Sequence, residues 1–129
     1  MTVDQWVLEY VRAQQAVFSA VGTNVYLYQV PSGVSQPYVH IQLVSGVRDP
    51  KTQTLRTAGS SRFQLDLYEK DRFQARTDIE ALMRSVIVSN VLTSGLRIEQ
   101  SEVLGPRMLP AEEGYRFSCD VNIIWVEEE

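Results

Sequence analysis

The sequence predicts an α+β domain in which two helices pack on one face of a mainly antiparallel sheet, in the order α-β-β-β-α-β-β. Apolar residues recur at helical spacing in two segments and alternate with polar residues in five others. Short and medium connections between the alternating segments favour antiparallel pairing, and the helices then cover the apolar side of the sheet. The 129 residues, of which 44% are hydrophobic, suit one ordinary domain, so residues 1–129 are expected to form a single unit.

The first predicted element is an amphipathic helix near the start of the chain. Thr2 and Gln5 have the spacing of a capping box, and Gly22 suits a left-handed stop. Between these signals an apolar stripe repeats every three or four residues, which is typical of one buried helix face. The stripe consists of Val3, Trp6, Val7, Tyr10, Val11, Val17, Phe18 and Val21.

Three strands are expected next, with approximate bounds 24–30, 38–45 and 61–68. Pro37 opens the second strand, where a missing N–H breaks no ladder. The polar side of this strand is a possible interface face, and it consists of Tyr38, His40 and Gln42. In the third strand Phe63, Leu65 and Leu67 alternate with polar residues, so one of its faces is expected to meet water.

A polar insertion at about residues 47–59 separates the second and third strands and is longer than a hairpin needs. It is expected to be a loop, either a solubilising one or a contact surface for DNA, an acidic partner or a neighbouring subunit. As a contact surface it would be mobile in the free subunit and ordered in an assembly. The residues expected to make this contact are Val47, Arg48, Asp49, Lys51, Gln53, Leu55 and Arg56.

The second helix is expected to start near Asp71, which has Gln74 three residues later as a cap-like pair. Its predicted buried stripe consists of Phe73, Ile79, Leu82, Met83, Val86 and Ile87. Gly95 ends a turn, and a fourth strand "LRIEQSEV" follows at residues 96–103. A turn-rich connector at 104–114 then leads to the last strand, in which alternate residues from Tyr115 to Trp125 are apolar.

The residue inventory argues against an enzyme. His40 is the only histidine and Cys119 the only cysteine, and no phosphate-binding glycine loop or spaced pair of carboxylates is present. We therefore predict no catalytic, cofactor-binding or metal-binding residues and no cofactor. Cys119 shares the parity of the apolar residues of its strand and is expected to be a buried, inert thiol.

The charge and hydropathy patterns argue against nucleic-acid-binding, membrane and secreted proteins. A net charge of −4 argues against a general nucleic-acid binder, because such binding needs clustered Lys and Arg. No apolar run approaches the roughly 20 residues of a membrane span, so no membrane partner is expected. The acidic N-terminal segment does not have the pattern of a signal peptide. The expected location is a cytoplasm or a particle assembled there.

Three stretches in a fixed order carry a family resemblance. They are "VYLYQVPSGVSQPYVHIQLVSG", the polar insertion, and "RFQLDLYEKDRFQARTDIEALMRSVI". Through their order and spacing, the chain from residue 24 to about residue 88 resembles the tail-completion, or head–tail joining, family of tailed bacteriophages and phage-like particles. The last strand has the closing position of that family.

The resemblance implies a structural virion protein, located in the neck or tail and in the host cytoplasm during assembly. Its copies would form a ring, six-fold on a six-fold tube, that terminates the tail tube at its head-proximal end and joins it to the head. The implied partners are other copies of the chain, the major tail tube protein and a head connector or adaptor protein. DNA would pass through the ring lumen without sequence-specific binding.

Two alternatives stay open. One is a head–tail adaptor or connector subunit nearer the portal, which would be a ring protein with different neighbours. The other, from a different class, is a cytoplasmic module that binds a small ligand between the helices and the sheet.

Overall fold

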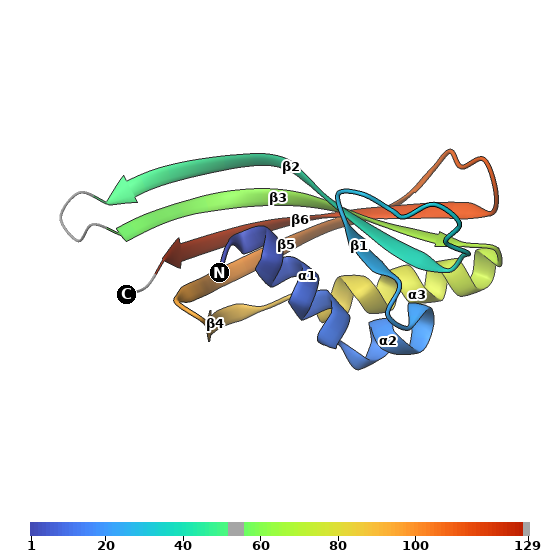
Figure 1. Ribbon diagram of the computed structural model, residues 1–129, viewed down its shortest axis with the longest axis horizontal. Helices are drawn as coiled ribbons and strands as arrows, with labels where there is room; N and C mark the ends of the chain where they lie inside the picture. Colours follow the sequence, from blue (N-terminus) through green and yellow to red (C-terminus); the bar gives the residue numbers. More distant parts are fainter. Residues whose placement is uncertain (52–55, 128–129) are drawn as a thin grey trace.

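A computed structural model, which describes residues 1–51 and 56–127, shows a mixed α+β fold with a curled sheet (Figure 1). The described residues form three helices, α1 (Val3–Ala13), α2 (Gln15–Val21) and α3 (Arg72–Ser85). They also form six strands, β1 (Val25–Leu27), β2 (Tyr38–Lys51), β3 (Arg56–Glu69), β4 (Ser89–Thr93), β5 (Leu96–Leu109) and β6 (Tyr115–Glu127). Within this part of the chain, no helix has the length and apolar character needed to cross a membrane.

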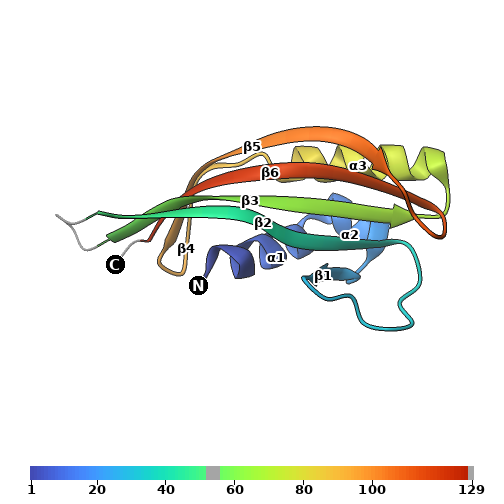
Figure 2. The same ribbon diagram turned by 90° about the horizontal axis from the view of Figure 1, so that it is seen from above.

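The six strands form one sheet in the order β1-β2-β3-β6-β5-β4. Neighbouring strands are antiparallel, except that β1 and β2 are parallel. All three helices lie on the same side of the sheet (Figures 1 and 2), and we call this side the helix face and the other side the open face. The predicted α+β class is confirmed, whereas the predicted number and order of elements are not.

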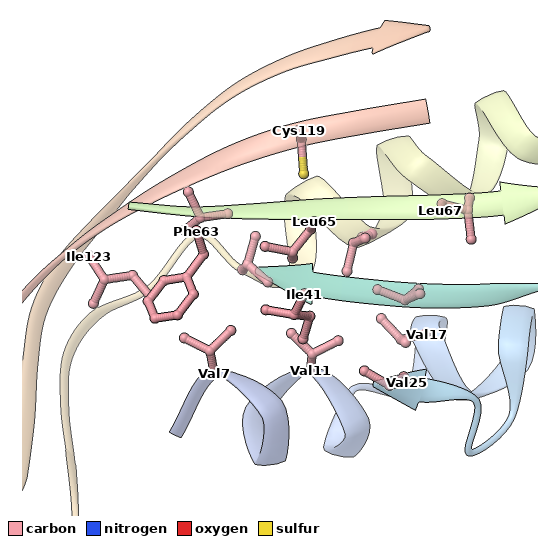
Figure 3. Close-up of a cluster of buried hydrophobic side chains, with 14 of the residues drawn as sticks. Val7, Val11, Val17, Val25, Ile41, Phe63, Leu65, Leu67, Cys119 and Ile123 are labelled. Atoms are coloured by element: carbon pink, nitrogen blue, oxygen red, sulfur yellow. The ribbon is translucent and has the colours of Figure 1, made fainter. Parts of the chain in front are cut away.

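The core lies between the helices and the helix face. Val7 and Val11 of α1 point toward the strands, where Phe63 and Leu65 of β3 are completely buried (Figure 3). The apolar positions predicted for the third and last strands are buried, except for Tyr115 at the start of β6. The buried members are Phe63, Leu65, Leu67, Phe117, Cys119, Val121, Ile123 and Trp125. The expectation that the other face of the third strand meets water is wrong at Asp66, which is completely buried.

The predicted limits of the first helical region are confirmed by its caps. The backbone N–H of Gln5 donates to Thr2 Oγ1 over 3.4 Å, and the Thr2 N–H donates to Gln5 Oε1 over 3.1 Å. These reciprocal bonds satisfy two of the donors that a helix start leaves unpaired. At the other end Gly22, with φ of 65°, terminates α2.

The prediction of one continuous helix in this region is wrong, because the helix is broken at Gln14, whose ψ is 126°. Gln14 lies three residues after buried Val11 and is therefore a polar residue on the apolar stripe. Restarting the helix after Gln14 changes its phase, so that Val17 and Val21 are buried while Phe18 is 52% exposed. The six-residue step from Val11 to Val17 is the sequence signal of this break.

Helix α3 begins at the predicted cap, since Asp71 Oδ1 accepts hydrogen bonds from the backbone N–H groups of Phe73 and Gln74. Its predicted apolar stripe is partly wrong. Phe73 and Ile87 are 84% and 63% exposed, and Met83 is partly buried. The buried positions are Ala75, Ile79, Leu82 and Val86. This set steps by four, three and four residues, and Phe73 is out of phase with it, whereas Ile87 lies beyond the end of the helix.

The predicted inserted loop at 47–59 is wrong in its described part, because β2 continues to Lys51 and β3 begins at Arg56. The two strands pair as far as Lys51 and Arg56, and Ala58 of β3 also pairs with Val126 of β6. Pairing on both sides of β3 satisfies its backbone groups, so this polar segment is stable as a strand. The polar composition had suggested a loop. The predicted contacts Gln53 and Leu55, and the predicted mobility of the tip, lie outside the described residues.

The first predicted strand is shorter than expected and differs in direction. It covers only Val25–Leu27, and Tyr28 leaves the strand with φ of 65°. The chain then returns along the connection at 28–37 before β2 begins, which makes β1 parallel to β2. The expectation of antiparallel pairing for this pair, based on a short connection, is therefore wrong.

The second half of the chain contains an additional strand, β4, which pairs with the start of β5. A two-residue turn joins them, and both of its residues have positive φ, 47° at Ser94 and 80° at Gly95. The predicted connector at 104–114 is also wrong in part, because β5 extends to Leu109. A bulge accommodates Gly105, where a Cβ atom would lie 3.2 Å from the Cα of Cys119. Glycine fits this close approach because it has no Cβ atom, and the bulge allows the turn-like residues "GP" to lie within a strand.

Candidate interaction surfaces

The open face carries a hydrogen-bonded network around Asp66, which we call the Asp66 cluster. Asp66 is completely buried, and its Oδ2 lies 2.8 Å from Arg116 Nη2. Gln64 Nε2 donates to both carboxylate oxygens, over 3.0 and 3.1 Å. The Arg116 guanidinium lies 5.6 Å from the centre of the Tyr68 ring, which stacks on Tyr38 at 4.7 Å. Burial disfavours the charged form of Arg116, but the bond to Asp66 and the charges of Asp66, Tyr68 and Tyr38 together outweigh it and raise the pKa of Arg116.

A second network, the Asp120 cluster, lies on the same face. Asp120 Oδ2 accepts from Arg62 Nη2 over 2.7 Å, and the two Asp120 oxygens accept from Arg107 over 3.2 Å each. Burial opposes ionisation of the Asp120 carboxyl, but the bonds from both arginines outweigh it and lower its pKa. The arginines of both clusters are thus hydrogen-bonded to carboxylates of the open face.

The predicted interface face of β2 belongs to this open face. Its Tyr38 is part of the Asp66 cluster, as described above. His40 Nε2 lies 2.7 Å from the Tyr28 carbonyl oxygen, so this nitrogen carries the proton and donates it. His40 Nδ1 is then the acceptor facing Gln42 Nε2 at 3.5 Å. Both ring nitrogens of the imidazole are therefore engaged in the structure of the sheet, which is an unsuitable arrangement for a general base.

The other predicted contact residues lie on the hairpin of β2 and β3. Val47, Arg48, Asp49 and Lys51 belong to β2, and Arg56 begins β3. The register pairs Val47 with Ser60 and Lys51 with Arg56. The sheet therefore separates these positions from His40 by several rungs of the ladder, and the two predicted sets form two surfaces.

An exposed apolar pocket, which the sequence did not predict, lies where α3 begins. We call it the Phe73 pocket, and it has a volume of about 450 Å³. It is lined by Arg72, Phe73, Arg76, Pro106, Met108 and Phe117. Met108 is 55% exposed and pairs with buried Phe117 across β5 and β6. The signal for this pocket is Phe73, which is an aromatic residue outside the phase of the buried stripe of its helix.

Cys119 is the one thiol of the chain, and its surroundings do not suit a nucleophile. Cys119 is completely buried, and burial together with the charges of Asp120 and Asp66 raises its pKa to about 12. The predicted burial of this thiol is confirmed, and its nucleophilic form is strongly disfavoured. Across residues 1–51 and 56–127, no group of three or more His, Cys, Asp or Glu side chains could hold a metal ion.

Comparison with known proteins places this fold in context. The family model described as "Tail completion protein gp17" matches residues 5–128. A chain from the solved structure "Virion of native gene transfer agent (GTA) particle" has 15% sequence identity and a TM-score of 0.60, with 94% of this chain and 89% of that chain covered. At this identity the likeness is one of fold. No curated protein matches the sequence.

Proposed function

Because this chain belongs to the tail completion protein gp17 family, we propose that its copies form a ring at the head-proximal end of a phage tail. The family makes the chain a structural component of the virion tail or neck. In the proposed role, the ring stops growth of the tail tube and provides the surface that joins it to the head connector. A six-fold ring would match a six-fold tube.

The observation that carries this proposal is the extent of the family match, from residue 5 to residue 128. This range includes every described strand and nearly all of α1, so the whole fold and not one motif supports the assignment. The neck of a phage-like particle is an assembly of rings, and a single domain of this kind suits such a repeated subunit.

We propose the outer part of the β2–β3 hairpin as a contact with a neighbouring subunit or with the tail tube. This hairpin forms one extreme of the longest axis of the molecule (Figure 1). The proposed contact residues are Val47, Arg48, Asp49, Lys51, Gln53, Leu55 and Arg56, and they include several basic residues. A projecting, basic strand pair suits a partner that offers carboxylates.

The charge of the chain supports a role around a DNA passage. The net charge of −4 disfavours phosphate binding, and the arginines of the open face are held by Asp66 and Asp120. Arginines that are paired in this way have less tendency to hold DNA. DNA would therefore slide through the ring without sequence-specific binding.

Beneath α1, the core disfavours the small-ligand alternative. The cavity beside Trp6, Val7 and Leu65 has a volume of about 10 Å³. This is room for about one water molecule. A head–tail adaptor nearer the portal remains the second candidate, since the family and the fold suit both positions in the neck. We propose no catalytic activity for either.

The experiment that tests this function is removal of the gene from the phage or particle producer, followed by electron microscopy of the products. We expect DNA-filled heads separate from tails, with tails that are unjoined or longer than normal. An adaptor role would instead leave tails of normal length beside heads that lack their connector surface. Joined, infectious particles of normal length would contradict the proposal.

A variant with a shorter hairpin tests the proposed contact. Asp49 pairs with Ala58, so residues 50–57 can be replaced by an Asn-Gly turn without changing the β3–β6 ladder from Ala58 onward. We expect this variant to fold with an unchanged circular dichroism spectrum and to fail in complementing the deletion. Normal joining by the shortened chain would show that the hairpin is no essential contact.

A further inference from the structure

We propose that a pocket at one end of the open face binds an extended, uncharged polypeptide segment of a different virion protein. The pocket has a volume of about 640 Å³ and lies between the connections 28–37 and 110–114. Tyr38, Tyr68 and Arg116 are among the residues that line it, and we call it the Tyr38 pocket. This inference rests on the proposed role in the tail or neck and adds a contact that is separate from the outer hairpin.

The Tyr38 pocket presents aromatic side chains that hold one another in place. The rings of Tyr38 and Tyr68 stack with their centres 4.7 Å apart, and the Tyr26 ring meets Tyr38 edge to face at 6.4 Å. The Arg116 guanidinium lies 5.6 Å from the centre of the Tyr68 ring. Tyrosine and arginine are enriched among the residues that dominate protein interfaces, because they combine a large contact area with hydrogen-bonding groups. Side chains that already contact one another lose less freedom when a partner binds.

The two walls of the pocket are joined to each other. Gln36 Nε2 donates to the Glu113 carbonyl oxygen over 2.8 Å, and Lys70 Nζ lies 3.7 Å from Glu113 Oε1. A Cβ atom at Gly114 would overlap Gln36 Oε1 and lie 2.9 Å from the Glu69 carbonyl oxygen, so glycine is needed for this close packing. These contacts connect the segments before β2, after β3 and before β6. The pocket is therefore formed in the chain without a partner.

The charges of the pocket disfavour an anionic occupant such as a nucleic acid. Arg116 is bound to Asp66 over 2.8 Å, and Lys70 lies beside Glu113. Glu112, which is exposed, adds a further carboxylate to the lining. The two cations of the described lining are thus matched by carboxylates, and no excess of positive charge is left for phosphate. An uncharged segment suits the pocket better, since grooves lined by aromatic side chains commonly bind extended segments, and it leaves the ion pair of Asp66 in place.

A second copy of the chain is an unsuitable source of this segment. Within residues 1–51 and 56–127, the two longest segments outside helices and strands are 28–37 and 110–114. Both form walls of the Tyr38 pocket, and Gln36 joins them. A copy that offered either segment to its neighbour would open its own pocket. The segment therefore comes from a different protein, which in the tail or neck belongs to an adjacent part of the particle.

Photo-cross-linking in assembled particles tests the inference. Azidophenylalanine replaces Tyr38, which it resembles in size and shape, so that the pocket keeps its form. After irradiation we expect a cross-link to one segment of a different virion protein, identified by mass spectrometry. The matched control places azidophenylalanine at Phe18, an aromatic residue on α2 that is 52% exposed and outside the pocket lining. This control should give no cross-link to that segment.

A blocking variant tests whether the pocket is needed for joining. Ser35 and Ser32 are both exposed on the connection 28–37, but only Ser35 lines the pocket. Ser35→Trp should lower the yield of joined, infectious particles by roughly 10-fold or more, the effect of losing one strong contact. Ser32→Trp should leave the yield unchanged. Circular dichroism of each purified chain checks that it folds, and the cross-link from Tyr38 does not depend on either variant.

The outcomes separate this inference from the proposed function. If the ring is present in the neck but position 38 gives no cross-link, or one to DNA or to another copy, the inference is overturned and the ring proposal stands. Normal joining by a folded Ser35→Trp chain would also overturn the inference. Absence of the chain from both the tail and the neck would overturn both.

Discussion

The two faces of the central strands differ in how they exclude water. On the helix face, Phe63 and Leu65 are buried by helices and need no polar partner. On the open face, Asp66 of the same strand is equally buried, but only because side chains of its own face cover it and satisfy its charge. Alternate residues of one strand thus serve the core and a polar surface.

This difference indicates which surfaces stay in contact with water in an assembly. Asp66 and Asp120 of the open face already have arginine partners, so a subunit docked on these ion pairs would gain little unless it replaced those bonds. Exposed apolar residues are present at the Phe73 pocket and on β4, and Leu104 lies beside Arg62 and Asp120 on the open face. We therefore expect the paired charges of the Asp66 and Asp120 clusters to contribute little to association between copies.

The largest effect is expected on the helix face. Phe63→Ala should lower the free energy of unfolding by about 3–5 kcal/mol, because the side chain is completely buried. The matched variant Phe73→Ala, at a position that is 84% exposed, should change it by less than about 0.5 kcal/mol. Urea denaturation of the isolated chain measures both. Similar losses for the two phenylalanines would show that the comparison of surfaces is wrong.

A smaller effect is expected on the open face. Asp120→Ala removes three hydrogen bonds from Arg62 and Arg107. It should lower the free energy of unfolding by about 1.5–3 kcal/mol, at the low end of this range because both arginine side chains reach water. The control Glu80→Ala breaks the exposed pair with Arg76 on α3 and should cost about 0.3–0.5 kcal/mol. An equal loss of stability for Glu80→Ala and Asp120→Ala would contradict the prediction that the Asp120 cluster stabilises the fold more than an exposed ion pair does.

The smallest expected effect is a pH dependence of stability, which the open face should show and the helix face should not. The folded-state pKa of Asp120 is lowered from 3.8, so its contribution is complete above that pH and is lost as the pH falls through the folded value. The stability difference between the natural chain and Asp120→Asn should therefore be constant near neutral pH and shrink below about pH 3.8. The corresponding difference for Phe63→Ala, which involves no titrating group, should stay constant. Denaturation midpoints at a series of pH values test this, and a constant difference for Asp120→Asn would contradict it.

The helix face could be predicted from the sequence because burial there repeats locally, as in the alternation from Phe63 to Leu67. The apolar stripes predicted for the helices include Phe18 and Phe73, which are exposed. Apolar character alone does not show that a residue near a stripe is buried, so the break at Gln14 and the exposure of Phe73 do not follow from the pattern. The sequence of the outer hairpin predicts a loop, because its polar residues show no alternation with apolar ones. Its pairing as strands depends on β6, more than 60 residues later. β4 is absent from the predicted elements, although Ser94-Gly95 is a recognisable hairpin turn.

The candidate surfaces were harder to predict for the same reason. Tyr38 and His40 were assigned to a polar face by parity, but their partners Tyr68 and Tyr28 are set by strand register. The Phe73 pocket combines α3 with β5 and β6, which meet only in the folded chain. Local patterns report which side of an element is apolar, whereas a surface requires the placement of several elements together.

The most direct test of the proposed role is a cryo-EM reconstruction of the particle neck at a resolution that traces the chain. We expect a closed ring of copies on the last ring of the tail tube, facing the head connector and surrounding the DNA passage. Location of the chain in the portal-side adaptor, in the capsid or at the distal tip of the tail would contradict a role in completing the tail.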